Sequence, residues 1–375
     1  MEHNKQLIMD ISFFNTYISP KAYKKVKEVL DSTFLSEGDV VKEFESELHK
    51  KLGFINPVTV NSCTSALHLA LILAGVKEGD EIILPTQTFI ATGMVILMQK
   101  AKPVFADIQY ETGNICPESI KKKITKKTKA IIAVHWGGYP CDMDEINEIA
   151  RQYNIKVIED AAHALGAVYK NRPIGSISDF TCFSFQAIKH LTTADGGAIC
   201  CKNHEDYVRA KRLRWFGIDR FNSKPSILGE REYDVSEIGY KYHLNNFSAA
   251  LGIANLNDIN QILERRIQIA EIYNSELKNC KGIQLLDYMN DRKSAWWLYT
   301  FLVDNRINFI TKLKEKNIPA SVVHLRIDKN SVFGGVRNDL VFQEKFNQNQ
   351  ISIPVHSDLS DEQVELILKT IKEGW

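Results

Sequence analysis

The sequence has no run of about 20 apolar residues, the length that a membrane-spanning helix needs. It also lacks the opening of a secretory signal, because MEHNKQLIMDISF is acidic and has only a short apolar stretch. Lysine and arginine number 47 and aspartate and glutamate 46, so the net charge is +1. This balance gives no overall bias toward nucleic acid or an anionic membrane surface. We therefore expect a cytoplasmic globular protein that binds neither nucleic acid nor membranes.

Cysteine is present, but in no pattern typical of disulfides or metal sites. The seven cysteines are odd in number, Cys200 and Cys201 are adjacent, and no two form a CxxC pair. This usage indicates reduced thiols and argues against a disulfide framework or a zinc site. A GxGxxG motif after a first strand is also missing, which argues against a nicotinamide-dependent oxidoreductase.

Short apolar runs alternate with helix-like patterns between residues 55 and 205. Strands separated by single helices predict an α/β fold with a mostly parallel sheet flanked by helices. Ligands of such sheets bind outside the carboxyl ends of the strands, so the residues that follow each strand are the candidates for a site. The expected strands are VTVNS, EIILP, KPVFADI, AIIAVHW, KVIED, FTCFSF and GGAICCK.

A length of 375 residues favours two domains. We expect a large domain over residues 1–250 and a smaller C-terminal α+β domain over residues 251–375. The helix-periodic stretch 246–278 is predicted as one long connecting helix, and ASVVHL at residues 320–325 as a strand of the smaller domain. The polar, turn-rich segment 219–236 is the best candidate for a mobile loop.

Small hydroxyl residues follow the first strand, where a helix is predicted to begin. Ser62, Thr64 or Ser65 can cap this helix, whose free backbone N–H groups attract anions. By itself the stretch is better explained as a simple helix cap. Phe89 follows the end of the strand EIILP, where an aromatic ring can stack on a planar ligand, although a core position is the more common role.

Two carboxylates, Glu159 and Asp160, close the apolar strand KVIED. A carboxylate at the buried end of a central strand costs much free energy unless it meets a cation, which can be a structural partner or a cationic ligand. His163 lies three residues further on and can contact the same ligand, although a surface position also explains it.

Lys189 lies between two strands, with Ser184 at the end of the first and Gly196 and Gly197, which permit close backbone approach, at the start of the second. Most lysines are simply exposed, but one held at such a place loses its proton readily and attacks carbonyl carbons. Together with Asp160 it forms the pair that pyridoxal 5′-phosphate (PLP) requires. The lysine bonds to the cofactor aldehyde, and the carboxylate keeps the pyridine nitrogen protonated.

Six longer segments carry a resemblance to a known family, and the Lys189 segment together with EDAAHA is the most specific part of it. They are FLSEGDVVKEFESEL, GDEIILPTQTFIATGMVILMQKAKPVFADI, AIIAVHWGGYPCDMDEI, VIEDAAHALGA, FSFQAIKHLTTADGGAI and ISIPVHSDLSDEQVELI. Over nearly its whole length the chain resembles the nucleotide-sugar aminotransferases of the DegT/DnrJ/StrS type, and among them the perosamine synthases. This PLP-dependent family has the aspartate-aminotransferase-like fold.

The resemblance implies a role for each candidate residue. Lys189 is the lysine that bonds to PLP, Asp160 pairs with the pyridine nitrogen, and His163 bonds to the phenolic oxygen of the ring. Phe89 matches the stacking aromatic residue. The resemblance further implies a large PLP domain, a smaller C-terminal domain, and a homodimer whose active sites lie at the subunit interface. The implied phosphate binders are Thr64, Ser65 and Ser184.

Three departures from the family pattern are visible. Cys63 stands where glycine usually precedes the threonine of the phosphate loop, and Ala194 also replaces a usual glycine. Lys241 and His243 stand where the family has asparagine and arginine. In the family that asparagine reaches the cofactor phosphate of the partner subunit, so Lys241 is expected to take this role as a point charge.

The implied reaction transfers the amino group of L-glutamate to a nucleotide-linked 4-keto-6-deoxyhexose. The product is a 4-amino-4,6-dideoxy sugar for a surface glycan or a polysaccharide such as O antigen. Amination of a 3-keto sugar is the main alternative within the family. A keto-sugar 3-dehydratase carries histidine in place of the lysine, so Lys189 disfavours it. Retention of Lys189 and Asp160 also disfavours a non-catalytic PLP-binding regulator.

Overall fold

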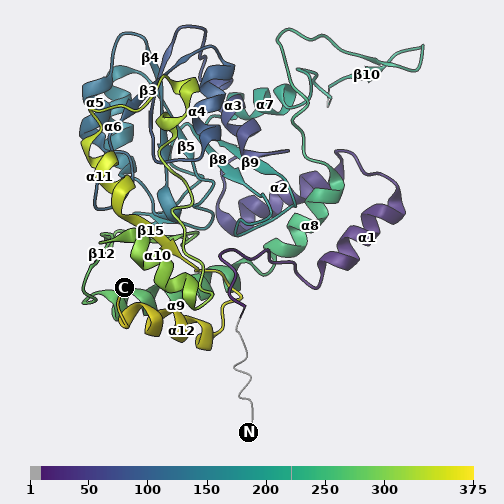
Figure 1. Ribbon diagram of the computed structural model, residues 1–375. Coiled ribbons are helices and arrows are strands. Elements are labelled where there is room, and N and C mark those ends of the chain that lie inside the picture. The colour runs from purple at the N-terminus through teal and green to yellow at the C-terminus, as the bar shows by residue number, and fades with distance from the viewer. Residues whose placement is uncertain (1–9, 221) are drawn as a thin grey trace.

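The structure, a computed structural model, describes residues 10–220 and 222–375. A seven-stranded sheet of order β1-β9-β8-β5-β4-β2-β3 forms its centre (Figure 1). Six of these strands are parallel, and β9 runs antiparallel to its neighbours β1 and β8. This arrangement confirms the predicted α/β fold. The strands are β1 (Pro57–Val60), β2 (Glu81–Pro85), β3 (Lys102–Ala106), β4 (Thr128–Val134), β5 (Lys156–Asp160), β8 (Phe180–Ser184) and β9 (Gly197–Cys201).

Helices cover both faces of this sheet, which explains why the middle residues of its strands are mostly apolar. On one face α2, α5, α6 and α8 share a core with the strands, and on the other face α3, α4 and α7 do so. The helix α1 packs on α8. These helices are α1 (Ala22–Ser32), α2 (Asp39–Leu52), α3 (Cys63–Leu73), α4 (Ile90–Met98), α5 (Pro117–Lys123), α6 (Met143–Tyr153), α7 (His204–Leu213) and α8 (Asn246–Leu256).

The C-terminal part contains an antiparallel sheet of order β12-β14-β15. It shares a separate apolar core with α9, α10 and α12, at the lower left of Figure 1. The elements are α9 (Ile259–Leu277), β12 (Ile283–Leu285), β14 (Tyr299–Val303), α10 (Arg306–Glu315), α11 (Val341–Asn349), β15 (Gln350–Ile353) and α12 (Asp361–Lys372). Shorter elements are η1 (Trp136–Gly138), β6 (Val168–Tyr169), β7 (Arg172–Pro173), β13 (Arg292–Lys293), η2 (Ile327–Lys329) and η3 (Ser331–Phe333).

Two predictions about the C-terminal part are wrong. The stretch 246–278 is not one helix, because the chain leaves helical geometry at Asp258 and separates α8 from α9. Short polar side chains favour helix ends, and the Asp258 carboxylate accepts a hydrogen bond from the Tyr17 hydroxyl at 3.0 Å. Residues 320–325 form no strand beyond an isolated bridge at Ser321, because Val323 has φ of 58°, which extended chains do not adopt.

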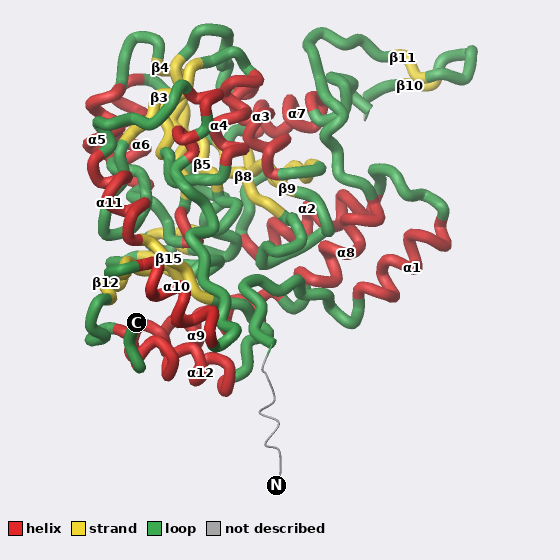
Figure 2. Tube along the Cα trace, viewed as in Figure 1, coloured by secondary structure: helices red, strands yellow, loops and turns green. Residues whose placement is uncertain are grey.

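The predicted domain boundary at residues 250 and 251 falls inside α8 and stays a prediction. Two segments stand away from the body of the molecule. One is α1, and the other is the predicted mobile segment, which carries the two-residue strands β10 (Lys224–Pro225) and β11 (Arg231–Glu232). Figure 2 shows that most of this second arm is loop. Among the described residues, no helix combines the length and the apolarity that crossing a membrane requires.

Candidate active site

A cavity of about 420 Å³ lies at the carboxyl ends of the central strands. Its walls include residues that follow β1, β2, β5 and β8, as the predicted sheet requires. Six of the eight predicted site residues line it, and two do not. Those lining it are Thr64, Phe89, Asp160, His163, Ser184 and Lys189; Ser65 and Lys241 lie outside it.

Lys189 reaches the cavity from the loop that joins β8 to β9. Burial lowers the pKa of its ammonium group from 10.5 to about 7. At physiological pH, Lys189 therefore carries a neutral amine in a substantial fraction of the molecules. The backbone around it is tightly packed. A Cβ on Gly197 would lie 2.6 Å from the Cys63 nitrogen, so only glycine fits where the loop rejoins the sheet.

Asp160 is the last residue of β5 and is buried. The Thr92 hydroxyl donates to its Oδ2 at 2.7 Å, and the Ala162 N–H donates to its Oδ1 at 3.2 Å. Thr92 is itself hydrogen-bonded to the Thr88 hydroxyl at 2.7 Å. Burial raises the pKa of Asp160, and both hydrogen bonds oppose the rise because they stabilise the carboxylate. The site therefore keeps an oriented carboxylate that favours a cationic ligand.

Glu159 has a structural role, since adjacent strand residues point to opposite faces of the sheet. It is fully buried beside His135, with 2.9 Å between Glu159 Oε2 and His135 Nε2. His135 Nδ1 accepts from the Cys141 N–H at 3.0 Å, so Nε2 carries the proton and donates it to Glu159. The Thr181 hydroxyl also donates to Glu159 at 3.0 Å. Thus Asp160, and not Glu159, is the carboxylate available to a ligand.

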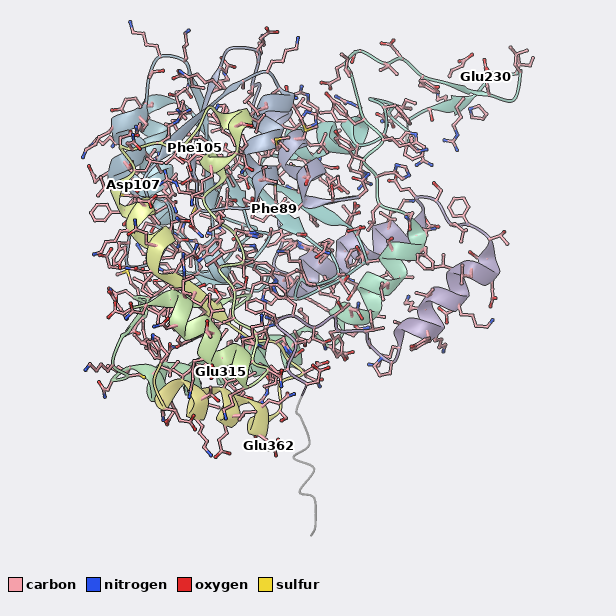
Figure 3. All side chains as sticks on the ribbon, viewed as in Figure 1. Phe89, Phe105, Asp107, Glu230, Glu315 and Glu362 are labelled. Carbon is pink, nitrogen blue, oxygen red and sulfur yellow. The ribbon has the colours of Figure 1, made fainter. Side chains whose placement is uncertain are left out.

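His163 and Phe89 line the cavity with rings. Burial holds the pKa of His163 well below its usual value, so its imidazole is neutral. Its Nδ1 is buried and has no hydrogen-bond partner among the described residues. Phe89, labelled in Figure 3, is 55% exposed and lines the cavity, so its ring is open to a planar ligand.

The amino end of α3 contributes an anion-binding position to the cavity. Ser62 caps this helix, and its Oγ accepts the Ser65 N–H at 3.1 Å. The Ser65 hydroxyl donates to Asn61 at 2.6 Å, which turns it away from the cavity that Ser62 and Thr64 line. Burial raises the pKa of the Cys63 thiol well above 9, so this residue adds an uncharged group next to the helix end.

Lys241 is exposed and lies beside the cavity rather than in it. Its backbone pairs with Trp215, and its carbonyl accepts from the Asn61 amide at 3.4 Å. Within one chain, therefore, it does not reach the site, and the predicted contact with a partner subunit stays a prediction.

Sequence reasoning missed four residues of the site. Thr88 and Thr92 support Asp160 as described above, and the PTQTFIAT segment that contains them could have indicated this. Trp297 and His324 line the cavity from the C-terminal part. The strand-like surroundings of both residues gave no local signal for a place in the cavity. His324 follows Val323, whose φ of 58° interrupts the expected strand.

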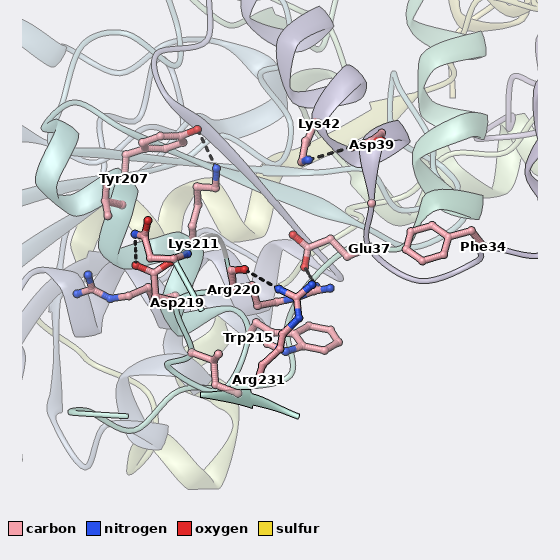
Figure 4. A pocket seen from close by; sticks show the side chains of 15 residues that line it. Phe34, Glu37, Asp39, Lys42, Tyr207, Lys211, Trp215, Asp219, Arg220 and Arg231 are labelled. Atoms are coloured by element: carbon pink, nitrogen blue, oxygen red, sulfur yellow. Dashed lines mark hydrogen bonds and ion pairs between the residues drawn. The ribbon is translucent and has the colours of Figure 1, made fainter. Parts of the chain in front are cut away.

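A second hollow of about 470 Å³ lies between the start of α2 and α7 (Figure 4). Its charged side chains pair with each other. Arg220 contacts Glu37 at 3.1 Å, and Lys42 contacts Asp39 at 2.9 Å. Because its carboxylates Glu37 and Asp39 are taken up by these ion pairs, this hollow is a weaker candidate than the cavity around Lys189.

The cavity around Lys189 fits PLP. It combines a partly neutral lysine, a carboxylate held at a strand end, an unpartnered imidazole nitrogen and a helix end that attracts anions. In a mostly parallel α/β sheet, this is the arrangement of a PLP-dependent enzyme.

The comparison with known proteins identifies the family. Residues 16–372 match the DegT/DnrJ/EryC1/StrS aminotransferase family, and the chain belongs to it. The chain is 36% identical to the spore coat polysaccharide biosynthesis protein SpsC of Bacillus subtilis, covering 95% of each. It is 32% identical to the GDP-perosamine synthase of Escherichia coli O157:H7, covering 97% of this chain and 98% of the relative. It is 33% identical to the UDP-4-amino-4-deoxy-L-arabinose–oxoglutarate aminotransferase of Shewanella sediminis, covering 93% and 94%.

Solved structures agree with this assignment. The sugar aminotransferase CalS13 of Micromonospora echinospora superimposes with a TM-score of 0.93 at 32% identity, covering 97% of this chain and 100% of that one. The PLP form of Spr1654 of Streptococcus pneumoniae gives a TM-score of 0.89 at 31% identity, covering 97% of this chain and 98% of that one. These findings confirm the predicted family of PLP-dependent sugar aminotransferases, and with it the predicted cofactor.

Proposed function

We propose that the protein transfers the amino group of L-glutamate to the keto carbon of a nucleotide-linked 4-keto-6-deoxyhexose, which yields a 4-amino-4,6-dideoxy sugar. The observation that carries the proposal is the presence of Lys189 and Asp160 in one cavity of a family member. The name of the Shewanella relative, at 33% identity, supports both oxoglutarate as co-product and amination at C4.

Lys189 is assigned the proton transfers. Bound PLP supplies an aldehyde that captures amines and a protonated ring that accepts electrons. With a pKa of about 7, the Lys189 amine can serve both as base and as acid. Its Nζ accepts the proton from the α-carbon of glutamate in the first half-reaction. In the second half-reaction it donates a proton to the sugar carbon that receives the amino group.

The other cavity residues orient the cofactor and exclude water. Asp160, held by Thr92, would bind the pyridine N–H, and the unpartnered Nδ1 of His163 would bind the phenolic oxygen. Thr64, Ser184 and the amino end of α3 would bind the phosphate. Phe89 would cover one face of the ring. Ser62, which lines the cavity, would bind the phosphate in place of Ser65, which does not line it.

We also propose a homodimer with shared active sites. Among the described residues that line the cavity, Lys189 is the sole lysine and there is no arginine, so the phosphate lacks a cationic partner within one chain. Lys241 of a second subunit is the proposed partner. The arm at residues 219–236 supports this assembly, because Ile227 and Leu228 are 102% and 83% exposed and offer apolar surface to a second subunit.

The proposed setting is the cytoplasm, on a route to a surface polysaccharide such as O antigen. The seven cysteines are all free, which is the usual state in a reducing compartment. The 36% identity to SpsC, named for spore coat polysaccharide biosynthesis, supports the destination of the product.

The deciding experiment incubates purified protein and L-glutamate with GDP-, dTDP- and UDP-linked 4-keto and 3-keto sugars. Mass spectrometry detects amination, and NMR locates the new amino group. We expect a 4-amino-4,6-dideoxy product from one nucleotide series. Amination at C3 alone, or formation of no amino sugar, would contradict the proposed acceptor.

Two variants test the assigned chemistry. Lys189→Ala should abolish turnover while it still binds PLP, and Lys314→Ala, at an exposed lysine of α10, is the matched control. Asp160→Asn should slow both half-reactions, since the amide cannot stabilise a protonated ring nitrogen. Normal transamination by either site variant would remove the role assigned to that residue.

A mixing experiment tests the shared site. Lys189→Ala and Lys241→Ala homodimers are dissociated and recombined. If Lys241 serves the partner's cofactor, heterodimers regain one intact site and part of the activity. An active Lys241→Ala homodimer, or no recovery in verified heterodimers, would contradict the role of Lys241.

A further inference from the structure

Trp297 is a buried side chain of the C-terminal part that reaches the cavity of the seven-stranded sheet. It is 2% exposed, precedes β14 and lines the cavity together with Lys189. Its ring stacks on His163 with 3.8 Å between centroids and on Phe14 with 5.0 Å. It is therefore fixed in place by aromatic neighbours before any ligand binds.

The same tryptophan contacts both the amine and the loop of Lys189. The Nζ of Lys189 lies 3.3 Å from the centre of the indole ring. The indole N–H donates to the carbonyl of Ile188 at 3.1 Å. On the other side of the lysine, His190 Nε2 donates to the carbonyl of Ala295 at 2.7 Å. Residues 295–297 thus hold the loop immediately before and after Lys189.

We propose that Trp297 is a positioning residue that holds the protonated Lys189 amine over its ring, from the moment the amine accepts a proton until it delivers that proton. The inference rests on the proposed function, because that function requires Lys189 to be released and recaptured in each half-reaction. The lysine amine sits on a flexible four-carbon stem. Without such a support, the protonated amine would sample many positions. A displacement of about 1 Å from the reacting carbon can cost roughly 100-fold in rate.

The contact depends on the protonation of the amine. An indole face attracts an ammonium ion and gains nothing comparable from a neutral amine. The pKa of Lys189 is about 7, whereas the pKa of His324 is lowered to about 4 and those of His163 and His190 lie well below 6.5, all through burial. The histidines therefore stay neutral while Lys189 titrates. Other charged or titratable groups that act on Lys189 are Asp160, Cys63 and Arg266.

The first test uses the apoenzyme and needs no turnover. Tryptophan fluorescence is recorded against pH for the wild type, Trp297→Phe, Lys189→Met and Trp296→Phe. A cation on an indole face changes its emission, so the wild type should show a step with a midpoint near the pKa of Lys189, about 7. Trp297→Phe and Lys189→Met should both lose this step. Trp296→Phe, which removes the adjacent indole packed on Tyr288 and Tyr299, should keep it.

A step that survives in Lys189→Met, or its absence from the wild type, would overturn the proposal. Because Lys189→Met leaves Trp297 in place, this outcome can be read even if Trp297→Phe folds poorly.

The second test measures proton transfer with α-deuterated glutamate. Trp297→Leu should slow the first half-reaction by about 10- to 100-fold and increase its deuterium isotope effect, with less than about a twofold change in KM for glutamate. Trp297→Phe keeps a ring under the amine and should restore part of the rate. An unchanged isotope effect in Trp297→Leu, or no gain from phenylalanine, would contradict the proposal.

Borohydride reduction of the wild type distinguishes a failure of the proposed PLP-dependent function from a failure of the positioning role of Trp297. If no PLP becomes attached to Lys189, the proposed function itself fails. If PLP is attached and Trp297→Leu still behaves as the wild type, only the positioning role fails.

Discussion

Replacing the central lysine should make the apoenzyme more stable. Burial lowers the pKa of Lys189 from 10.5 to about 7, so the folded chain resists a proton that the unfolded chain binds. A shift of that size corresponds to about 5 kcal/mol at neutral pH. The amine still faces the cavity and lies over the Trp297 ring, and both features reduce the free-energy cost of burying its charge. We therefore expect Lys189→Met to raise the free energy of unfolding at pH 7 by about 2–4 kcal/mol.

The pH dependence identifies the cause. Between pH 7 and 10.5 the unfolded state binds more protons than the folded state at this residue, so the cost of Lys189 shrinks as the pH rises. Urea unfolding of apoenzyme at equal protein concentration should show a gap in the free energy of unfolding between variant and wild type. Between pH 7 and 10.5, this gap should be largest near pH 7. The gap should fall by more than half by pH 9.5. Lys314→Met, on the exposed face of α10, should show no such gap. A destabilised Lys189→Met, or a gap independent of pH, would refute the reasoning.

Three further changes test other parts of the structure. Thr92→Val removes a hydrogen bond to a charged carboxylate, worth about 1.5–3 kcal/mol, so PLP should bind about 10-fold more weakly in a spectroscopic titration, while Thr92→Ser should bind normally. Equal affinity in Thr92→Val would show that the hydroxyl does not support Asp160. Ala194 has φ of 70°, and Ala194→Gly should stabilise the chain by about 1 kcal/mol in thermal unfolding. Leu228→Asp should weaken the dimer in sedimentation experiments without changing the fold of the monomer; an unaltered dimer would remove the arm from the interface.

The central sheet and the strand-end residues could be predicted from sequence because both follow from local patterns. Apolar runs separated by helical stretches define a parallel sheet, and such a sheet gathers its carboxyl ends at one edge. Lys189 and Asp160 meet there although 29 positions separate them in the sequence. A helix cap was visible in the same way, although the roles of Ser62 and Ser65 depend on side-chain directions that the sequence does not fix.

The contribution of the C-terminal part could not be predicted, because long-range packing determines it. Trp297 has the surroundings of an ordinary strand residue, and its contact with Lys189 joins residues that are far apart in the sequence. Residues 320–325 have strand propensity, but Val323 adopts a left-handed conformation, and the next residue, His324, lines the cavity. The long helical stretch divides at Asp258, whose carboxylate accepts a hydrogen bond from the distant Tyr17 hydroxyl.

Both parts of the chain supply cavity residues, Asp160 and Lys189 from the first and Trp297 and His324 from the C-terminal part, and this has a consequence for protein engineering. Transplanting the segment after α9 from a relative would exchange the cavity wall to which His324 and Trp297 contribute, while Asp160 and Lys189 remain native. Such hybrids would succeed only when the incoming segment brings a side chain that supports the lysine as Trp297 does. Compatibility at this one aromatic position would therefore decide which donors are usable.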